Sequence, residues 1–245
     1  DSPFNYMLGF YYESFDRRHE NASKLGLFGR DPARGFTNDQ HVIQDTDGDS
    51  WSVFGQVIWD ITDQWELAAG GRYLEDEKHG SQRHAYVHPF LLAIGWFPEG
   101  VDLDADTSDT DFSPEVTLTW RPNDNVTLWG AWKNGYKASG YSAPTVLTRT
   151  FGPENITFGE EDAHGFEIGV KSTLADGRVR LNVTAYDYDF EDLQVSQFRP
   201  ETTTFVIGNA ASAYTRGIEF DAVFQATDNL QLYAEGGYNK AKNDK

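Results

Sequence analysis

The sequence has no cysteine, one methionine and no long apolar run, and each scarcity excludes a class of protein. Without cysteine there is no disulfide framework, thiolate metal site or cysteine nucleophile. No stretch approaches the roughly 18 consecutive apolar residues of a spanning helix, and the mean hydropathy is −0.58. Cations are also scarce, since 20 Lys and Arg stand against 39 Asp and Glu. The resulting net charge of −19 repels phosphates, so we expect no nucleic-acid partner.

The 245-residue chain begins with neither methionine nor a basic-then-apolar secretory segment, so we interpret it as a mature or truncated chain. Its length alone allows one large domain or two small ones. Aromatic residues are abundant at 15%, with 7 Trp, 12 Tyr and 17 Phe. A chain this rich in aromatic residues and yet hydrophilic overall is unusual for a soluble domain.

Apolar and polar residues alternate with a period of two along most of the chain. The odd positions from Trp51 to Ile61, and again from Trp65 to Tyr73, are apolar or glycine. Such alternation predicts a strand with one apolar and one polar face. The same pattern predicts strands over 4–12, 112–121, 126–137, 166–174, 179–186, 218–225 and 230–239, and a weaker one near 203–208. We therefore expect an all-β, antiparallel fold of about ten or eleven strands, without an amphipathic helix of ordinary length.

The predicted connections alternate between short and long. Short polar turns rich in Asp, Asn, Gly or Pro lie at 62–64, 122–125, 175–178 and 227–229. Long connections lie at 14–48, 78–110, 138–161 and 191–202. Short turns at one end and long loops at the other are typical of a transmembrane β-barrel of the outer membrane.

The two faces of the predicted strands support the same interpretation. Tryptophan and tyrosine on the apolar face lie towards strand ends, where rings with one wet edge form girdles at bilayer interfaces. The other face carries charges such as Glu115, Lys133, Glu167 and Lys171. These charges would be costly in a dry core and cheap in a wet lumen. The alternative is a soluble antiparallel sandwich with one solvated face.

Five short stretches, in their order and spacing, resemble the barrel of TonB-dependent outer-membrane receptors. They are Phe54-Gly55-Gln56 with Gly71-Arg72-Tyr73, Gly135-Tyr136-Lys137-Ala138-Ser139-Gly140, Glu167-Ile168-Gly169-Val170-Lys171, Asp192-Leu193-Gln194-Val195, and Asn209-Ala210-Ala211 with Arg216-Gly217-Ile218-Glu219. The resemblance implies that residues 1–245 are part of a barrel of about 22 strands, and that the family's N-terminal plug domain is not in this chain. Ten strands closing into a small complete barrel are the alternative.

The resemblance also implies a function and partners. These are active uptake of a ferric siderophore or a similar scarce large nutrient across a Gram-negative outer membrane, energised by the TonB complex acting on the missing N-terminal region. Outer-membrane lipid and lipopolysaccharide would surround the wall. The alternatives are a small passive porin or adhesin and an outer-membrane enzyme barrel. No hydrolase signature or phosphate-binding loop is present, so we expect no enzyme.

Candidate ligand contacts are the aromatic and basic residues predicted to face the lumen. They are Tyr11, Trp129, Tyr186, Tyr188, Tyr233, Lys133 and Arg180. Filling of the wall or contact with a plug is the alternative role for each of them.

Metal binding has two weak signals. Asp45, Asp47 and Asp49 alternate in a predicted acidic loop, and hard cations such as calcium prefer such oxygen ligands. The spacing departs from a calcium-binding loop of the EF-hand type, so a solvated acidic loop is the alternative. His84 and His88 would share a face of a helix and hold zinc or haem there, but the following Pro89 argues against a helix. No cofactor is otherwise expected.

Overall fold

A computed structural model describes residues 2–24, 31, 33–35, 38–142, 147–200 and 204–244. Strands make up most of it, as the alternation predicts, and its helices are one short α-helix, α1 (Pro89–Ala93), and one 3-10 turn, η1 (Pro153–Asn155). The strands are β1 (Phe4–Ser23), β2 (Gln40–Asp60), β3 (Trp65–Val87), β4 (Asp102–Asn123), β5 (Val126–Lys137), β6 (Gly140–Tyr141), β7 (Thr157–Phe158), β8 (Glu161–Leu174), β9 (Val179–Arg199), β10 (Thr204–Thr227) and β11 (Leu230–Asp244). No helix of this part of the chain is long and apolar enough to cross a membrane.

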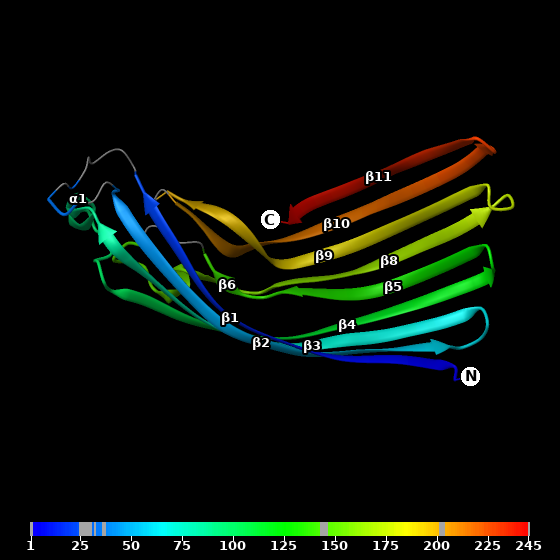
Figure 1. The fold of residues 1–245 in the computed structure, drawn as a ribbon, viewed down its shortest axis with the longest axis horizontal. Coiled ribbons are helices and arrows are strands. Elements are labelled where there is room, and N and C mark those ends of the chain that lie inside the picture. Colours follow the sequence, from blue (N-terminus) through cyan, green and yellow to red (C-terminus); the bar gives the residue numbers. More distant parts are fainter. Residues whose placement is uncertain are drawn as a thin grey trace.

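Nine strands form one curved antiparallel sheet in the order β1-β2-β3-β4-β5-β8-β9-β10-β11, and β6 pairs with β7 separately (Figure 1). Consecutive strands are neighbours, except that β6 and β7 lie in the connection between β5 and β8. In the described part of the chain, β1 and β11 are the two edges of the sheet and do not pair with each other. The described strands therefore do not close into a small complete barrel, as expected for part of a larger one.

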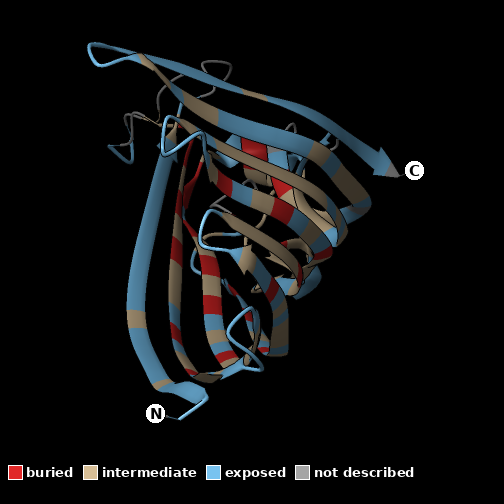
Figure 2. Ribbon diagram, turned by 90° about the vertical axis from the view of Figure 1, so that its right-hand side faces the viewer, coloured by how far each residue is buried: buried red, intermediate tan, exposed pale blue. Residues whose placement is uncertain are grey.

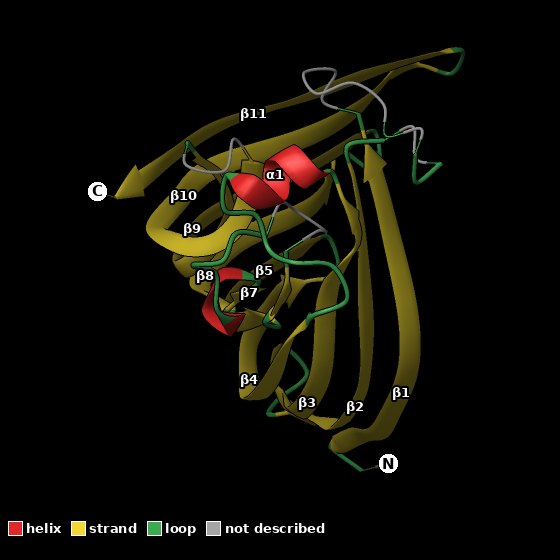
Figure 3. Cartoon of the chain, turned by 90° about the vertical axis from the view of Figure 1, so that its left-hand side faces the viewer, coloured by secondary structure: helices red, strands yellow, loops and turns green. Residues whose placement is uncertain are grey.

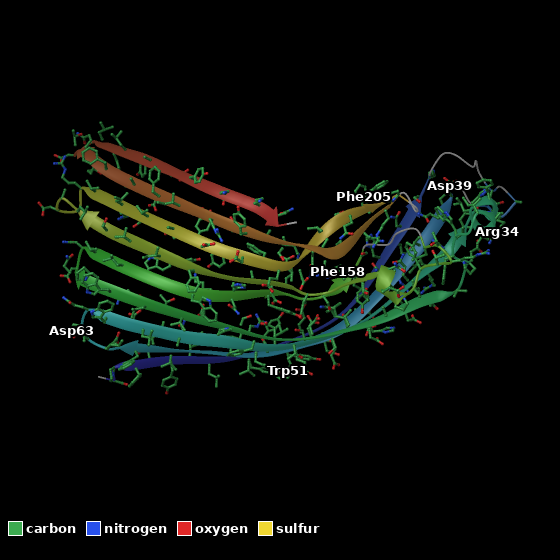
Figure 4. All side chains as sticks on the ribbon, turned by 180° about the vertical axis from the view of Figure 1, so that it is seen from behind. Arg34, Asp39, Trp51, Asp63, Phe158 and Phe205 are labelled. Carbon is green, nitrogen blue, oxygen red and sulfur yellow. The ribbon has the colours of Figure 1, made fainter. Side chains whose placement is uncertain are left out.

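Short turns and long connections lie at opposite ends of the sheet, as predicted (Figure 1). Figure 4 shows Asp63 in a turn at one end, and Arg34 and Asp39 at the other. In the turn between β8 and β9, Ala175 and Asp176 have φ of 54° and 55°, and Gly177 has φ of 85°. This left-handed backbone reverses the chain within four residues, which is why small and Asp-like residues occupy the turn.

The predicted bounds of three long connections are wrong, whereas the predicted 138–161 agrees closely with the structure. Most of 14–48 and 78–110 is paired strand, and the connections themselves span 24–39, 88–101, 138–160 and 200–203. The alternation fades because these outer parts of the strands carry polar residues on both faces, while their backbones remain paired to neighbouring strands. The strand predicted near 203–208 is present but is not separate, because β10 begins at Thr204 and runs on to Thr227. Register shifts between Asn209 and Ala213 interrupt its alternation.

Most of the sheet is only partly buried, and the buried residues concentrate on the strands near β3 (Figure 2). One small apolar cluster lies at the long-loop end, where residues of β4 meet the connection between β5 and β8 (Figure 3). It contains Leu103, Ala105, Leu147 and Ile156, with Phe97, Tyr141 and Phe151 packed against it. The sheet is thus a curved wall with a folded connection held against one end of its concave face.

Candidate functional site

The apolar residues form one continuous face of the sheet. Directly opposed residues of an antiparallel pair share a face, and the register joins Leu67 to Leu118 and Trp65 to Trp120. The rows continue through β5, β8 and β9 to Phe220 on β10. The apolar residues of the predicted alternating strands lie on this convex face, among them Trp59, Trp65, Trp120, Trp132, Leu67, Leu118, Val170, Leu181 and Phe220.

Aromatic rings border this apolar face at two heights, one near the turns and one nearer the long loops. At the turn end, Trp65 stacks on Trp120 with ring centroids 5.5 Å apart, and Phe4 stacks on Trp59 at 5.8 Å. Eight residues further along β1 to β4 stand Tyr12, Trp51, Tyr73 and Phe112, with Trp51 and Tyr73 5.6 Å apart. Eight residues rise about 26 Å along a strand, or about 20 Å along the normal of a membrane crossed at the usual tilt, close to the apolar band of about 25 Å. Figure 4 shows Trp51 on the convex side of the sheet.

The concave face carries a linked set of polar side chains at mid-wall. Lys133 Nζ donates to Glu167 Oε2 at 2.9 Å, and Tyr188 Oη donates to Glu167 Oε1 at 2.5 Å. On the neighbouring strands, Gln56 Nε2 donates to Glu115 Oε1 at 3.1 Å. Two predicted contacts, Lys133 and Tyr188, are thus brought together by Glu167, which the sequence placed on this face without assigning it a role.

Three of the candidate aromatic rings lie flat along the wall, each covering a glycine of the neighbouring strand. A Cβ at Gly169 would lie 2.5 Å from the Trp129 ring, and Cβ atoms at Gly165 and Gly217 would overlap Tyr188 and Tyr186. These glycines therefore leave the space that the rings fill. Trp129, Tyr186 and Tyr188 face the lumen as predicted, but part of their surface packs against the wall.

The remaining candidates are spread over the sheet. Tyr11 lies on β1 and donates to Glu13 Oε2 at 2.7 Å, with the Arg72 guanidinium 5.8 Å from its ring centre. Arg180 and Tyr233 are both aligned with Val223 and line a hollow beside the turn between β8 and β9. That hollow is at the end opposite the long loops, so these two residues and Tyr188 do not form one site.

In the connection between β5 and β8, the described residues 138–142 and 147–160 form a strap across the concave face. Tyr141 Oη lies 2.9 Å from the carbonyl oxygens of Lys78 and Ala105, and its ring fills the space above Gly80. Ser142 joins the two halves of the wall, because its carbonyl accepts from Gln44 Nε2 at 2.8 Å and its Oγ accepts from the Ile207 amide at 3.0 Å.

Two carboxylates mark the ends of the strap. Asp109 Oδ2 accepts from the Ser139 amide at 3.0 Å and from Ser139 Oγ at 2.5 Å. Glu160 lies near Asp162 and Asp109, and burial followed by repulsion from these carboxylates raises its pKa. Sequence reasoning treated this segment as an ordinary long loop, because its contacts join residues far apart in the chain.

The predicted acidic loop at Asp45, Asp47 and Asp49 is wrong, because all three lie in β2. Asp45 accepts from Arg18 Nε at 2.6 Å and from Arg83 at 3.2 Å, and Asp49 accepts from Tyr12 Oη at 2.6 Å. These donors occupy oxygen atoms that a calcium ion would need. Among the described residues, no group of three or more His, Asp or Glu side chains is placed to hold a metal ion.

His84 and His88 do not share a helix, in agreement with the argument from Pro89. His84 is fully buried in β3, with Nδ1 3.0 Å from the Phe97 carbonyl oxygen and its ring stacked on Trp96. His88 caps α1, where its Nδ1 accepts from the Phe90 amide at 3.2 Å. The two rings therefore do not share a helical face.

Comparison with known proteins decides what this wall belongs to. The family model described as "TonB dependent receptor-like, beta-barrel" matches residues 2–245. The chain belongs to the TonB-dependent receptor β-barrel family. It is therefore part of an outer-membrane barrel of Gram-negative bacteria, as the strand pattern and the motifs indicated.

Solved receptor structures share this fold at low sequence identity. The ferric yersiniabactin uptake receptor FyuA from Yersinia pestis has a TM-score of 0.78 at 15% identity, over 100% of this chain and 33% of that one. The ferric-catecholate import receptor Fiu from E. coli K12 gives 0.62 at 15% identity, over 99% and 36%. The siderophore receptor PiuA from Acinetobacter baumannii gives 0.57 at 17% identity, over 97% and 35%. The chain thus spans about a third of the length of these receptors.

Proposed function

We propose that the full-length protein is a ligand-gated transporter, energised through TonB, that imports a ferric siderophore or a similar scarce large nutrient. The membership of residues 2–245 in the receptor barrel family carries this proposal. The polar concave face supports it, because a lumen lined by Glu115, Lys133 and Glu167 is wet and suited to polar cargo. The protein would then act by binding and movement, without covalent chemistry and without a resident cofactor.

A plug domain from another part of the protein would fill the lumen and carry the contact with TonB. The open edges of β1 and β11 favour this arrangement over a small porin, adhesin or enzyme barrel. A wall of nine strands with two unpaired edges needs further strands, because unpaired backbone groups in lipid each cost several kcal/mol. A barrel that large has room for a plug.

Ligand would enter from the long-loop end. Its first contacts would therefore be the part of the concave face nearest the long loops and the middle of that face. Of the candidate residues, Lys133, Tyr186 and Tyr188 lie in this region. Trp129 is opposite Thr119, one residue from Trp120 of the turn-end aromatic row, and therefore lies nearer the turns. Tyr11 lies at a comparable level on β1. Arg180 and Tyr233, near the turns, are better placed to contact a plug.

Uptake of radioactive iron in cells whose only receptor is the full-length protein tests this function. Iron-loaded catecholate, hydroxamate and citrate carriers are supplied in turn, with and without a working TonB. We expect uptake of at least one carrier, lost without TonB. Uptake that persists without TonB would contradict the proposal, as would the absence of uptake for every carrier. Lys133→Gln should weaken uptake several-fold, whereas Lys171→Gln, on the same face near the turns, is the matched control.

A further inference from the structure

The convex face carries an apolar groove with charged residues at its end nearer the long loops. The lining of a lumen does not explain this groove. Its floor is made by Gly130 and Ala185, and bulky side chains rise beside them, with Ile168 66% exposed between the two. Gly130 is directly opposite both Leu118 and Ile168, and Ile168 is opposite Ala185. The row thus alternates large and small side chains and lines an open hollow of about 580 Å³. We name this hollow the outer groove.

The next row towards the long-loop end contains Trp132, Phe166 and Asp187, which also line the outer groove. The same row continues from Asp187 to Arg216 on β10 and Lys240 on β11. On β9, β10 and β11, the residues of this row are the first charged residues of the convex face beyond the apolar band, on the side of the long loops. The upper end of the groove therefore meets ionic groups at the height where lipid headgroups begin.

Three cations gather at this point, although the chain carries nearly twice as many acidic as basic residues. Arg216 is directly opposite Lys240, and Tyr214 is directly opposite Lys242. We name Arg216, Lys240 and Lys242 the basic corner. Like charges directly opposite each other in a sheet are destabilising unless an anion lies between or beside them.

The carboxylates nearby neutralise only part of this charge. Arg216 Nε donates to Asp187 Oδ1 at 2.7 Å, and its Nη2 lies 3.9 Å from Asp189 Oδ1. Lys240 Nζ is 5.9 Å from the centre of the Tyr214 ring. Among the residues whose side chains are described, no carboxylate forms an ion pair with Lys240 or Lys242. Both lysines are exposed on the face that meets lipid.

We propose that the outer groove and the basic corner together bind one lipopolysaccharide molecule of the outer leaflet. An acyl chain would lie in the groove over Gly130 and Ala185, and a phosphate of the headgroup would accept hydrogen bonds from Lys240 and Lys242. Arg216, held in place by Asp187, would complete the cationic site. A phosphate with an attached acyl chain fits because the two parts of the site adjoin on one face. This inference rests on the outer-membrane placement and adds a specific lipid partner to the proposed function.

Two variants of the full-length receptor separate the parts of the site. Lys240→Gln with Lys242→Gln removes the phosphate contacts. Gly130→Leu fills the groove, and its Cβ has room, since the nearest atom to a Cβ at Gly130 is 3.8 Å away. The controls are Lys171→Gln, which removes a lysine from the concave face, and Ala234→Leu, which adds the same bulk to the convex face outside the groove.

The measurement is native mass spectrometry of the purified receptors titrated with lipopolysaccharide, after heat-modified gel mobility has shown that each variant folds. We expect one lipid per wild-type receptor and affinity weakened roughly tenfold for each lysine removed. Gly130→Leu should also weaken binding, whereas both controls should bind like the wild type. Excess inorganic phosphate should not displace the lipid.

Wild-type affinity in the lysine variant or in Gly130→Leu would overturn the two-part site. No lipid on the wild type, equal losses in the controls, or displacement by inorganic phosphate would also overturn it. Iron uptake measured on the same variants keeps the two proposals distinguishable. If the wild type fails to take up iron but retains lipid, the transport function is contradicted and the lipid site stands.

Discussion

The contact between Tyr141 and Gly80 should control whether the strap stays on the concave wall. A Cβ placed on Gly80 would lie 2.5–2.7 Å from three atoms of the Tyr141 ring. Gly80→Ala must therefore displace the ring and lengthen the hydrogen bonding of its hydroxyl to Lys78 and Ala105, both now at 2.9 Å. Overpacking costs about 1–3 kcal/mol and the lost hydrogen bond about 0.5–1.5 kcal/mol, so the strap should lose about 2–4 kcal/mol.

Hydrogen exchange of the full-length protein measures this loss directly, because a local opening that becomes easier by about 2–4 kcal/mol exchanges roughly 30 to 1000 times faster. The increase should be confined to peptides from the strap and the facing parts of β3 and β4. Tyr141→Phe should give a smaller increase, and Gly130→Ala, which meets nothing closer than 3.8 Å, should give none. Unchanged exchange of the strap in Gly80→Ala would refute the reasoning.

Two further predictions concern the wall and the connection between β3 and β4. Val170→Arg, on the lipid face, should lower the unfolding free energy in lipid vesicles by about 2–4 kcal/mol, whereas Lys171→Arg next to it should not, and equal effects would contradict the assignment of faces. Glu99 accepts two hydrogen bonds from Arg34, at 2.9 and 2.7 Å, and these contacts hold its pKa below the ordinary value of 4.5. Their stabilisation is complete above pH 4.5 and is lost as the pH falls through the lowered pKa. The protection of 88–101, taken relative to the intrinsic exchange rate at each pH, should therefore be constant between pH 7 and 5 and fall only in stronger acid. Arg34→Gln should remove that dependence, and a loss of protection already near neutral pH would count against it.

The membrane-spanning part of the fold could be predicted from the sequence because lipid imposes a strict period of two. Contact with lipid explains the apolar side chains of Trp65 and Trp120, and likewise of Leu67 and Leu118. The structure places each pair side by side. Above the apolar band this constraint ends. Polar residues such as Asp45 then occupy both faces of strands that remain paired, and the sequence there resembles a loop.

The contacts within the concave face were less predictable. That Lys133 and Tyr188 face the lumen follows from alternation, but their meeting at Glu167 depends on the register between β5, β8 and β9. The strap depends on hydrogen bonds between residues more than 60 positions apart, such as Tyr141 and Lys78. Gly80 lies in a segment that the sequence predicted to be a long connection, and only the packed structure shows which ring fills its space.

A structure of the full-length protein in a lipid environment tests the central claim, that this chain is one part of a larger plugged receptor wall. We predict that β1 and β11 each form a ladder of hydrogen bonds with a strand outside residues 1–245, and that the lumen beside Lys133 and Glu167 contains a plug. Direct pairing of β1 with β11 around an unplugged lumen would contradict the account.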